Sequence, residues 1–197
     1  MRAFEYSGPI ETERLVLRAF EPEDLDAVHA MRSDPRVTRY LYWDVHTREE
    51  SRAALEQRIG FRGILKEGDV LAVAWVERTS GEIVGDLILR CLSTEHSVGE
   101  LGFVVLPDHQ GHGYATEASR AMLSVAFDEI GFHRVVGHLD ARNVASARVL
   151  EKLGMRREAH FVENEWVKGE WQSELVYAIL DREWRAPGAL VTPQPRR

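Results

Sequence analysis

The sequence predicts a single-domain α/β fold. Segments in which apolar and charged residues alternate, as in strands, are interspersed with segments whose apolar residues recur at helical spacing. Between residues 99 and 130, a strand, a glycine-bearing turn and a helix follow one another directly. Residues 10–185 contain no internal repeat and no linker, whereas residues 186–197 carry three prolines and are predicted to form a disordered tail.

Composition limits the function classes. The chain has 197 residues, is 44% hydrophobic and 29% charged, and carries a formal net charge of -7. These values are ordinary for a soluble globular protein, and the negative charge disfavours general nucleic-acid binding, which needs a basic patch. Cys91 is the only cysteine, so an internal disulfide is excluded and a reducing cytoplasm fits. No signal peptide and no apolar run of roughly 20 residues is present, so no membrane partner is expected.

The first third of the chain predicts one strand and two helices. Leu15 and Leu17 alternate with other side chains as in a strand. Pro22 and its acidic neighbours suit the first turn of a helix that runs to about Ser33 and is ended by Asp34-Pro35.

A second helix is predicted from Thr47, which has the capping-box spacing to Glu50, to about Gly60. The connection between the two helices is aromatic. Its aromatic residues either line one wall of a binding site or cover the core: Tyr40, Tyr42 and Trp43.

The rest of the chain predicts a strand-rich sheet and a further helix. Strands are expected over residues 70–77, 82–92, 134–140, 156–164 and 172–180. Gly81 supplies a hairpin turn between the first two of these. Asn143 is placed to cap a helix that runs through Leu153 and ends at Gly154.

The central unit has the outline of a phosphate-binding site. A strand over residues 101–105 ends at Pro107, and the small-residue turn Gln110-Gly111-His112-Gly113-Tyr114-Ala115 leads into a helix. Backbone N–H groups that open a helix are free to bind an anion, although an ordinary tight turn with glycines at positive φ is the alternative. The turn lacks the lysine of a P-loop and the third glycine of a dinucleotide fingerprint.

Two inner motifs carry a family resemblance. Gln110-x-x-Gly113-x-Ala115, directly after Val-Val-Leu-Pro, resembles the acyl-CoA-binding signature of the GNAT acetyltransferase superfamily. Asn143-Val-Ala-Ser146, followed by Glu-Lys-Leu-Gly-Met, resembles a segment of its RimJ/RimL-type branch. The resemblance extends less specifically over residues 10–185. It implies a GNAT fold with a mostly antiparallel mixed sheet, splayed at two parallel middle strands, with helices on both faces.

The resemblance also implies a function. A GNAT enzyme takes acetyl-CoA as acetyl donor and transfers the acetyl group directly to a primary amine. A protein N-terminal amine is favoured as acceptor, and a polyamine or an aminoglycoside is the alternative. Homodimers are common in the branch, and Trp166 and Trp171 are candidates for such an interface. A non-catalytic acyl-CoA sensor is the main alternative function, because Leu150 stands where many GNAT enzymes have a tyrosine acid. A nucleotide-phosphate binder is the weaker alternative.

Cofactor-binding residues are expected on three segments. The donor pyrophosphate needs N–H donors, which the backbone can supply at Gly111, His112, Gly113, Tyr114, Ala115 and Thr116, with Gln110 bracing the turn. By resemblance, the strand Phe103-Val104-Val105 carries a bulge and pairs with the pantetheine arm, and the N–H of Val105 polarises the thioester carbonyl. By the same resemblance, Asn143 contacts the pantetheine, although a plain N-cap would also explain it.

Two side chains are candidates for proton transfer. Glu100 lies on an otherwise apolar strand, so it is either the base that deprotonates or binds the acceptor amine, or an ion-pair partner of Arg90. Ser146 lies on one helix face with Asn143 and, by resemblance, near the thiolate, so it is the candidate general acid in the absence of the tyrosine. Asp86 and Trp75 are read as structural. His109-x-x-His112 is the only tempting histidine pair, and no metal site is predicted.

Overall fold

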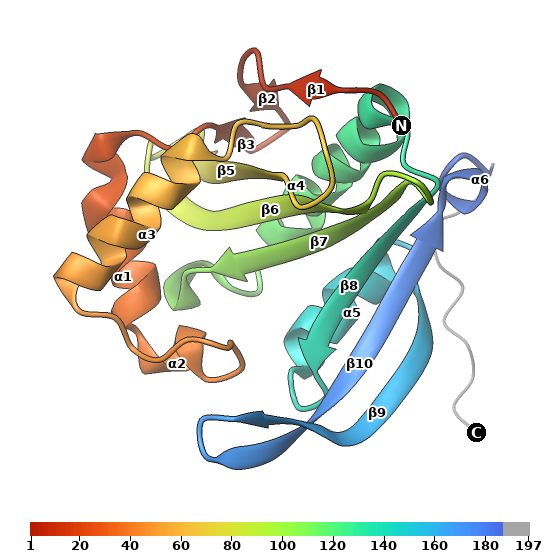
Figure 1. Cartoon of the computed structure of the whole chain (residues 1–197). Helices are drawn as coiled ribbons and strands as arrows, with labels where there is room; N and C mark the ends of the chain where they lie inside the picture. Colours follow the sequence, from red (N-terminus) through yellow and green to blue (C-terminus); the bar gives the residue numbers. More distant parts are fainter. Residues whose placement is uncertain (187–197) are drawn as a thin grey trace.

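The structure is a computed structural model that describes residues 1–186, and its centre is an eight-stranded sheet (Figure 1). In sheet order the strands are β2 (Ile10–Glu11), β3 (Leu15–Arg18), β5 (Val70–Glu77), β6 (Ile83–Ser93), β7 (Val98–Val105), β8 (Arg134–Asp140), β10 (Glu170–Leu180) and β9 (Arg156–Val167). All neighbours are antiparallel except β7 and β8, which are parallel. The predicted mixed sheet is therefore confirmed.

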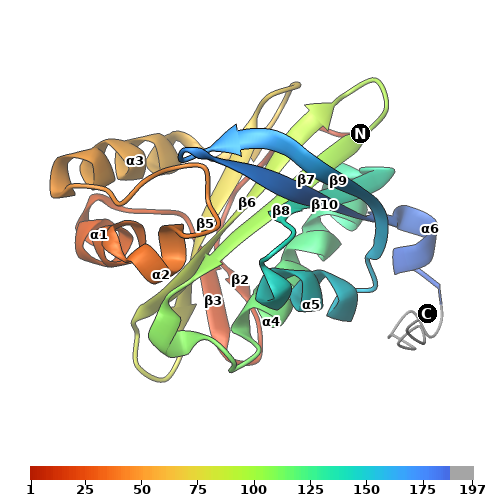
Figure 2. The same cartoon turned by 90° about the horizontal axis from the view of Figure 1, so that it is seen from below.

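Helices cover both faces of this sheet, as the sequence predicted (Figure 2). On one face lie α1 (Leu25–Ser33) and α3 (Arg48–Gly60), which enclose a core with the buried side chains Phe20, Val28, Leu55 and Ala74. On the other face lie α4 (Tyr114–Ser124) and α5 (Val144–Lys152), over the larger core around Leu87, Leu101, Met122 and Phe127.

The sheet opens between its two parallel strands. Pairing of β7 with β8 is confined to Val98↔Arg134, Gly99↔Val135 and Glu100↔Val136. Beyond Glu100 the two strands diverge, as Figure 1 shows. The second half of β7 therefore keeps β6 as a neighbour on one edge and faces an open gap on the other.

The expected bulge in β7 is wrong. The register between β6 and β7 is continuous from Gly85↔Val105 to Leu87↔Phe103, and the irregularity of this pair lies at the other end, between Cys91 and Ser93. The bulge was expected to leave backbone groups of β7 free for the pantetheine arm, and a regular strand leaves such groups free as well. In an antiparallel pair every second residue directs its N–H and C=O away from the neighbour, so β7 exposes backbone groups wherever β8 is absent.

Several short elements escaped the sequence analysis. The helix ending at Ser33 is followed at once by α2 (Pro35–Thr38), because the Asp34 side chain accepts from Arg36 N at 2.7 Å and caps a new helix. The beginning of the chain forms β1 (Phe4–Glu5), which pairs with β4 (Gly63–Ile64). α4 continues as a π-helical turn over Val125–Ile130, and α6 (Asp181–Trp184) follows β10.

Within residues 1–186, none of the helices has the length and apolar character needed to cross a membrane. The tail expected over residues 186–197 lies, beyond Ala186, outside the described residues.

Candidate active site

A cavity of about 330 Å³ lies where β7 and β8 part. It brings together four segments that are distant in sequence: α2 with the residues that follow it, the end of β7, the glycine turn with the start of α4, and α5 with its N-cap. The expected cofactor-binding residues that line it are Phe103, Val104, Val105, Gln110, Gly111, Gly113, Tyr114, Ala115, Thr116, Asn143 and Ser146. This size and this convergence of backbone and polar groups are typical of a small-molecule site.

The backbone of β7 directs donors into the gap. Leu106 N donates to Val84 O at 3.0 Å, so residue 106 is bonded to the neighbouring strand. By the alternation of an antiparallel pair, Val105 and Phe103 direct their N–H groups the other way, toward the side that β8 has left. The strand thus offers donors along one edge without any distortion.

The glycine turn places further donors beside that edge. Gly111 and Gly113 have φ of +80° and +83°, a region that favours glycine. Gly113 is also the N-cap of α4 and offers no side chain to the first N–H groups of the helix. Gln110 Nε2 donates to Val105 O at 3.4 Å, which ties the turn to β7. This hydrogen bond is of the kind expected if Gln110 braces the turn.

Asn143 and Ser146 lie together at the start of α5. Asn143 Oδ1 accepts from Ser146 N at 3.0 Å, which is an N-cap bond, and both residues line the cavity. The two readings of Asn143, as cap and as ligand, are thus compatible. Leu150, at the position of the missing tyrosine, is 2% exposed and packs against Gly137.

Three cationic side chains at the cavity were missed by the sequence analysis: Arg36, Arg148 and Lys152. Arg148 and Lys152 are four residues apart, so they share one helix face. Arg36 comes from α2, which pattern analysis did not detect. Its guanidinium pairs with Asp34 at 2.7 Å.

Glu100 lies outside the cavity lining, on the sheet face that α1 and α3 cover. Its Oε2 is 3.7 Å from Nη1 of Arg90, directly across on β6, so the ion pair considered from the sequence is present. The Glu100 side chain is half-buried, and Arg90 is more exposed.

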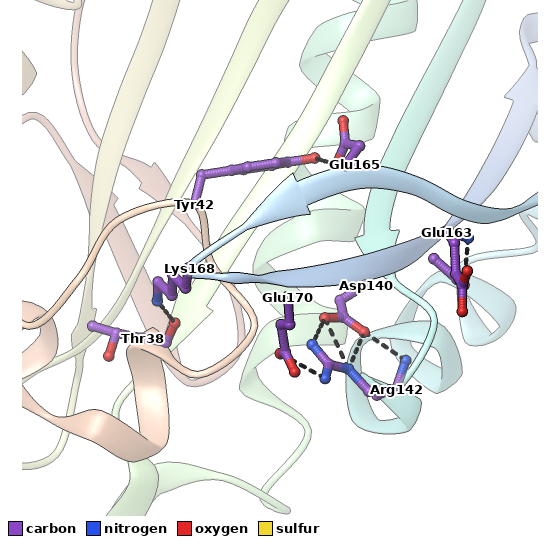
Figure 3. A network of polar contacts seen from close by, with 9 residues as sticks. Thr38, Tyr42, Asp140, Arg142, Glu163, Glu165, Lys168 and Glu170 are labelled. Atoms are coloured by element: carbon purple, nitrogen blue, oxygen red, sulfur yellow. Dashed lines mark hydrogen bonds and ion pairs between the residues drawn. The ribbon is translucent and has the colours of Figure 1, made fainter.

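The open end of the gap is bridged by two contacts (Figure 3). Tyr42 donates its hydroxyl to Glu165 Oε2 at 2.7 Å, and Lys168 Nζ donates to Thr38 O at 2.7 Å. Both contacts join the β9–β10 hairpin to the end of α2 and the segment that follows it. Burial and the hydrogen bond to Glu165 raise the pKa of Tyr42, and the carboxylates of Glu174 and Glu100 raise it further. Three carboxylates therefore act on the Tyr42 hydroxyl.

The aromatic connection after α2 contributes one ring to the cavity and places another against a buried arginine. Tyr40 lines the cavity, whereas the ring of Trp43 lies under the Arg32 guanidinium, 4.7 Å from centroid to Cζ. Deeper on the same face, Asp86 pairs with Arg58 at 2.6 Å, with both side chains largely buried. Trp75 is fully buried. Asp86 and Trp75 therefore have the surroundings of structural residues.

The two histidines of the His109-x-x-His112 pair have separate surroundings. His109 lines the cavity, while the His112 ring stacks on Tyr114 at 5.8 Å and is absent from the lining. Among residues 1–186, no three histidine, cysteine or acidic side chains gather as metal ligands would.

Comparison with known proteins agrees with this geometry. The family model described as "Acetyltransferase (GNAT) domain" matches residues 14–156. The uncharacterized N-acetyltransferase YnaD of Bacillus subtilis (strain 168) is 35% identical over 180 residues, which are 89% of this chain and 98% of YnaD. The crystal structure of a GNAT-family acetyltransferase from Bacillus anthracis superposes with a TM-score of 0.79 at 34% identity, covering 88% of this chain and 99% of that one.

A more distant structure shares the fold. The spermidine N-acetyltransferase of Vibrio cholerae, solved in complex with CoA and spermine, superposes with a TM-score of 0.74 at 20% identity, covering 88% of this chain and 99% of that one.

These findings support an enzyme and not a non-catalytic sensor or a nucleotide-phosphate binder. The splayed mixed sheet, the donor-lined gap and the match over most of the chain lead to one conclusion: the chain belongs to the GNAT family of acetyltransferases and is an acyltransferase.

Proposed function

We propose that this protein is an acetyl-CoA-dependent N-acetyltransferase whose functional domain spans residues 10–185 and which transfers the acetyl group directly to a primary amine. The observation that carries the proposal is the open edge of β7. Donors from Phe103 and Val105 face the same gap as the glycine turn, and a thioester with a phosphate-bearing tail needs both.

The donor is proposed to lie along that edge. Its pyrophosphate binds the N–H groups from Gly111 to Thr116, and its pantetheine arm takes the place that β8 has left. Arg36, Arg148 and Lys152 supply positive charge for the phosphates. The N–H of Val105 polarises the thioester carbonyl, and such a donor typically lowers the barrier by about 2.7–4 kcal/mol. The V. cholerae relative was solved with CoA, which supports this choice of cofactor.

The chemistry is a single displacement. The free amine attacks the thioester carbonyl carbon, the C–N bond forms, the C–S bond breaks, and CoA leaves as a thiolate. Glu100 accepts the proton of the acceptor ammonium, through water, before attack. The attacking nitrogen then loses its second proton, and Ser146, next to Asn143 in the cavity, takes up this proton as it gives its own to the thiolate.

The acceptor is proposed to be a cationic amine. The carboxylates of Glu100, Glu165 and Glu174 all act on Tyr42, and a negative potential attracts an amine that carries further positive charge, such as a polyamine. The relative from V. cholerae is named for spermidine. A protein N-terminal amine is the second candidate, supported by the RimJ/RimL-type motif Asn143-Val-Ala-Ser146 and the segment that follows it.

Two further expectations remain proposals. A cytoplasmic location is supported by Cys91, which is a buried free thiol. A homodimer is supported by Trp166 and Trp171, which pack edge to face at 5.3 Å yet stay exposed on the β9–β10 hairpin.

Calorimetric titration with acetyl-CoA, followed by a thiol-release assay, tests the proposal. The acceptor panel contains spermidine, an aminoglycoside and peptides with free N-termini. Binding with thiol release for one acceptor class supports the enzyme and names its substrate. Absence of acetyl-CoA binding would overturn the assignment of the glycine turn.

A further inference from the structure

Arg14 contacts the glycine turn but does not line the cavity. It lies just before β3, and its Nη1 donates to the carbonyl oxygen of His112 at 2.8 Å. Its Nε and Nη2 reach Oε2 of Glu117 at 2.7 and 2.6 Å. One guanidinium thus binds the middle of the turn and the first turn of α4 together.

Glu117 is held as a carboxylate. Its other oxygen, Oε1, accepts from Thr12 Oγ1 at 2.6 Å and from Arg14 N at 2.8 Å. Burial by itself would raise the pKa of the Glu117 carboxyl, but the hydrogen bonds from Thr12 and Arg14 outweigh it and hold the pKa below its usual value. The group is therefore ionised at neutral pH.

Tyr114 completes the support of the turn. Its ring lies 4.8 Å from Cζ of Arg14, and its hydroxyl donates to Glu77 at the end of β5. A Cβ on Gly113 would stand 3.4 Å from Arg14 Nη2, so Arg14 packs closely against the glycine at the helix N-cap. Arg14, just before β3, and Glu77, at the end of β5, thus anchor the turn.

The position of Glu117 creates an electrostatic conflict. A carboxylate in the first turn of a helix is favourable for the helix itself, but it repels an anion bound at the same N-terminus. The phosphates of the donor are proposed to bind there. A guanidinium with two N–H groups on one oxygen of that carboxylate removes the repulsion while the helix keeps its acidic first turn.

We infer that Arg14 is a positioning residue for the donor pyrophosphate: it cancels the charge of Glu117 and holds the His112 carbonyl away from the phosphates. This inference rests on the proposed use of acetyl-CoA. It assigns a function to residues that do not line the cavity and that no step of the chemistry requires.

Four variants test it: Arg14→Gln, Glu117→Gln, the double variant, and Arg78→Gln as a matched control. Arg78 is as exposed as Arg14, pairs with Glu11 at 3.0 Å and donates to Thr12 O at 3.1 Å, but it does not touch the turn. The measurements are calorimetric Kd values for acetyl-CoA, and kcat/KM with acetyl-CoA and with S-acetyl-pantetheine, which has no pyrophosphate.

Arg14→Gln is expected to weaken acetyl-CoA binding about tenfold or more, since the uncancelled charge of Glu117 then repels the phosphates at the partly buried helix N-terminus. Glu117→Gln leaves the affinity unchanged or raises it, and the double variant regains most of the affinity lost by Arg14→Gln. With S-acetyl-pantetheine, Arg14→Gln and the wild type have equal kcat/KM.

A double variant as weak as Arg14→Gln, or weaker, would show that Arg14 only braces the turn and would overturn the inference. Equal losses with both donors would overturn it as well, and so would a large effect of Arg78→Gln. A wild-type protein that does not bind acetyl-CoA would instead reject the proposed function, so the two failures are distinguishable.

Discussion

Arg90 and Glu100 stand directly opposite each other on β6 and β7, with 3.7 Å between Nη1 and Oε2. This separation is longer than a charge-assisted hydrogen bond, and Arg90 is nearly half exposed. An exposed pair of this kind contributes little to stability and leaves the carboxylate free to take a proton. The ion pair and the catalytic reading of Glu100 therefore do not exclude each other.

The first prediction separates the two readings. Glu100→Gln should lower kcat/KM about a hundredfold, because general bases typically contribute at least that factor, while the Kd for acetyl-CoA stays unchanged. Arg90→Gln is the matched control and should keep nearly full activity. Initial rates with a saturating acceptor and calorimetric titration measure both quantities. Equal losses in the two variants would assign Glu100 a purely structural function.

The second prediction concerns Ser146. Its backbone N–H is bonded to Asn143, so its hydroxyl is the group left to act in the cavity. Ser146→Ala should lower kcat by roughly tenfold to a hundredfold, the low end for a general acid, because a thiolate leaves readily. Ser146→Thr keeps a hydroxyl and should retain most of the activity. Steady-state kinetics at saturating acetyl-CoA measures kcat for both variants. An unchanged kcat in Ser146→Ala would leave water as the proton donor.

The third prediction concerns the buried pair Arg58–Asp86. The two side chains are 11% and 8% exposed, and Arg32 lies close enough for their charges to act on it. Asp86→Ala leaves buried cations without a carboxylate and should lower the free energy of unfolding by about 3–5 kcal/mol. Asp26→Ala, which breaks the exposed pair with Arg48, should cost less than about 1 kcal/mol. Urea unfolding curves give both values, and similar costs would contradict the prediction.

The sequence was informative where local physics decides the structure. A run of residues typical of strands predicted β8 with its observed bounds, and the capping box at Thr47 and Glu50 predicted α3. The parting of β7 and β8 leaves no local signal, because residues 101–105 alternate in the same way whether or not a neighbour is present. The family resemblance supplied that feature, and it also supplied the bulge that the regular register contradicts.

The same distinction applies to the site. The turn and the start of α5 are contiguous motifs, so sequence reasoning found most of their lining residues, although it missed Arg148 and Lys152. Arg36 reaches the cavity from α2, and Arg14 reaches the turn from β3. The contacts of Arg36 and Arg14 depend on how distant segments pack against each other, and the spacing of residues along the chain does not reveal that packing.

The last prediction concerns pH and His46. Burial, together with the neighbouring Arg32 cation, lowers the pKa of His46 below its usual 6.5. The unfolded state therefore binds a proton at a higher pH than the folded state, so stability is fully present above about pH 6.5 and falls as the pH drops toward the folded pKa. His46→Gln should flatten this part of the stability profile, and Arg32→Met should flatten it in part by removing the cation. Urea unfolding at pH 5 to 8 measures the slopes, and an unchanged slope in His46→Gln would assign the pH dependence to other groups.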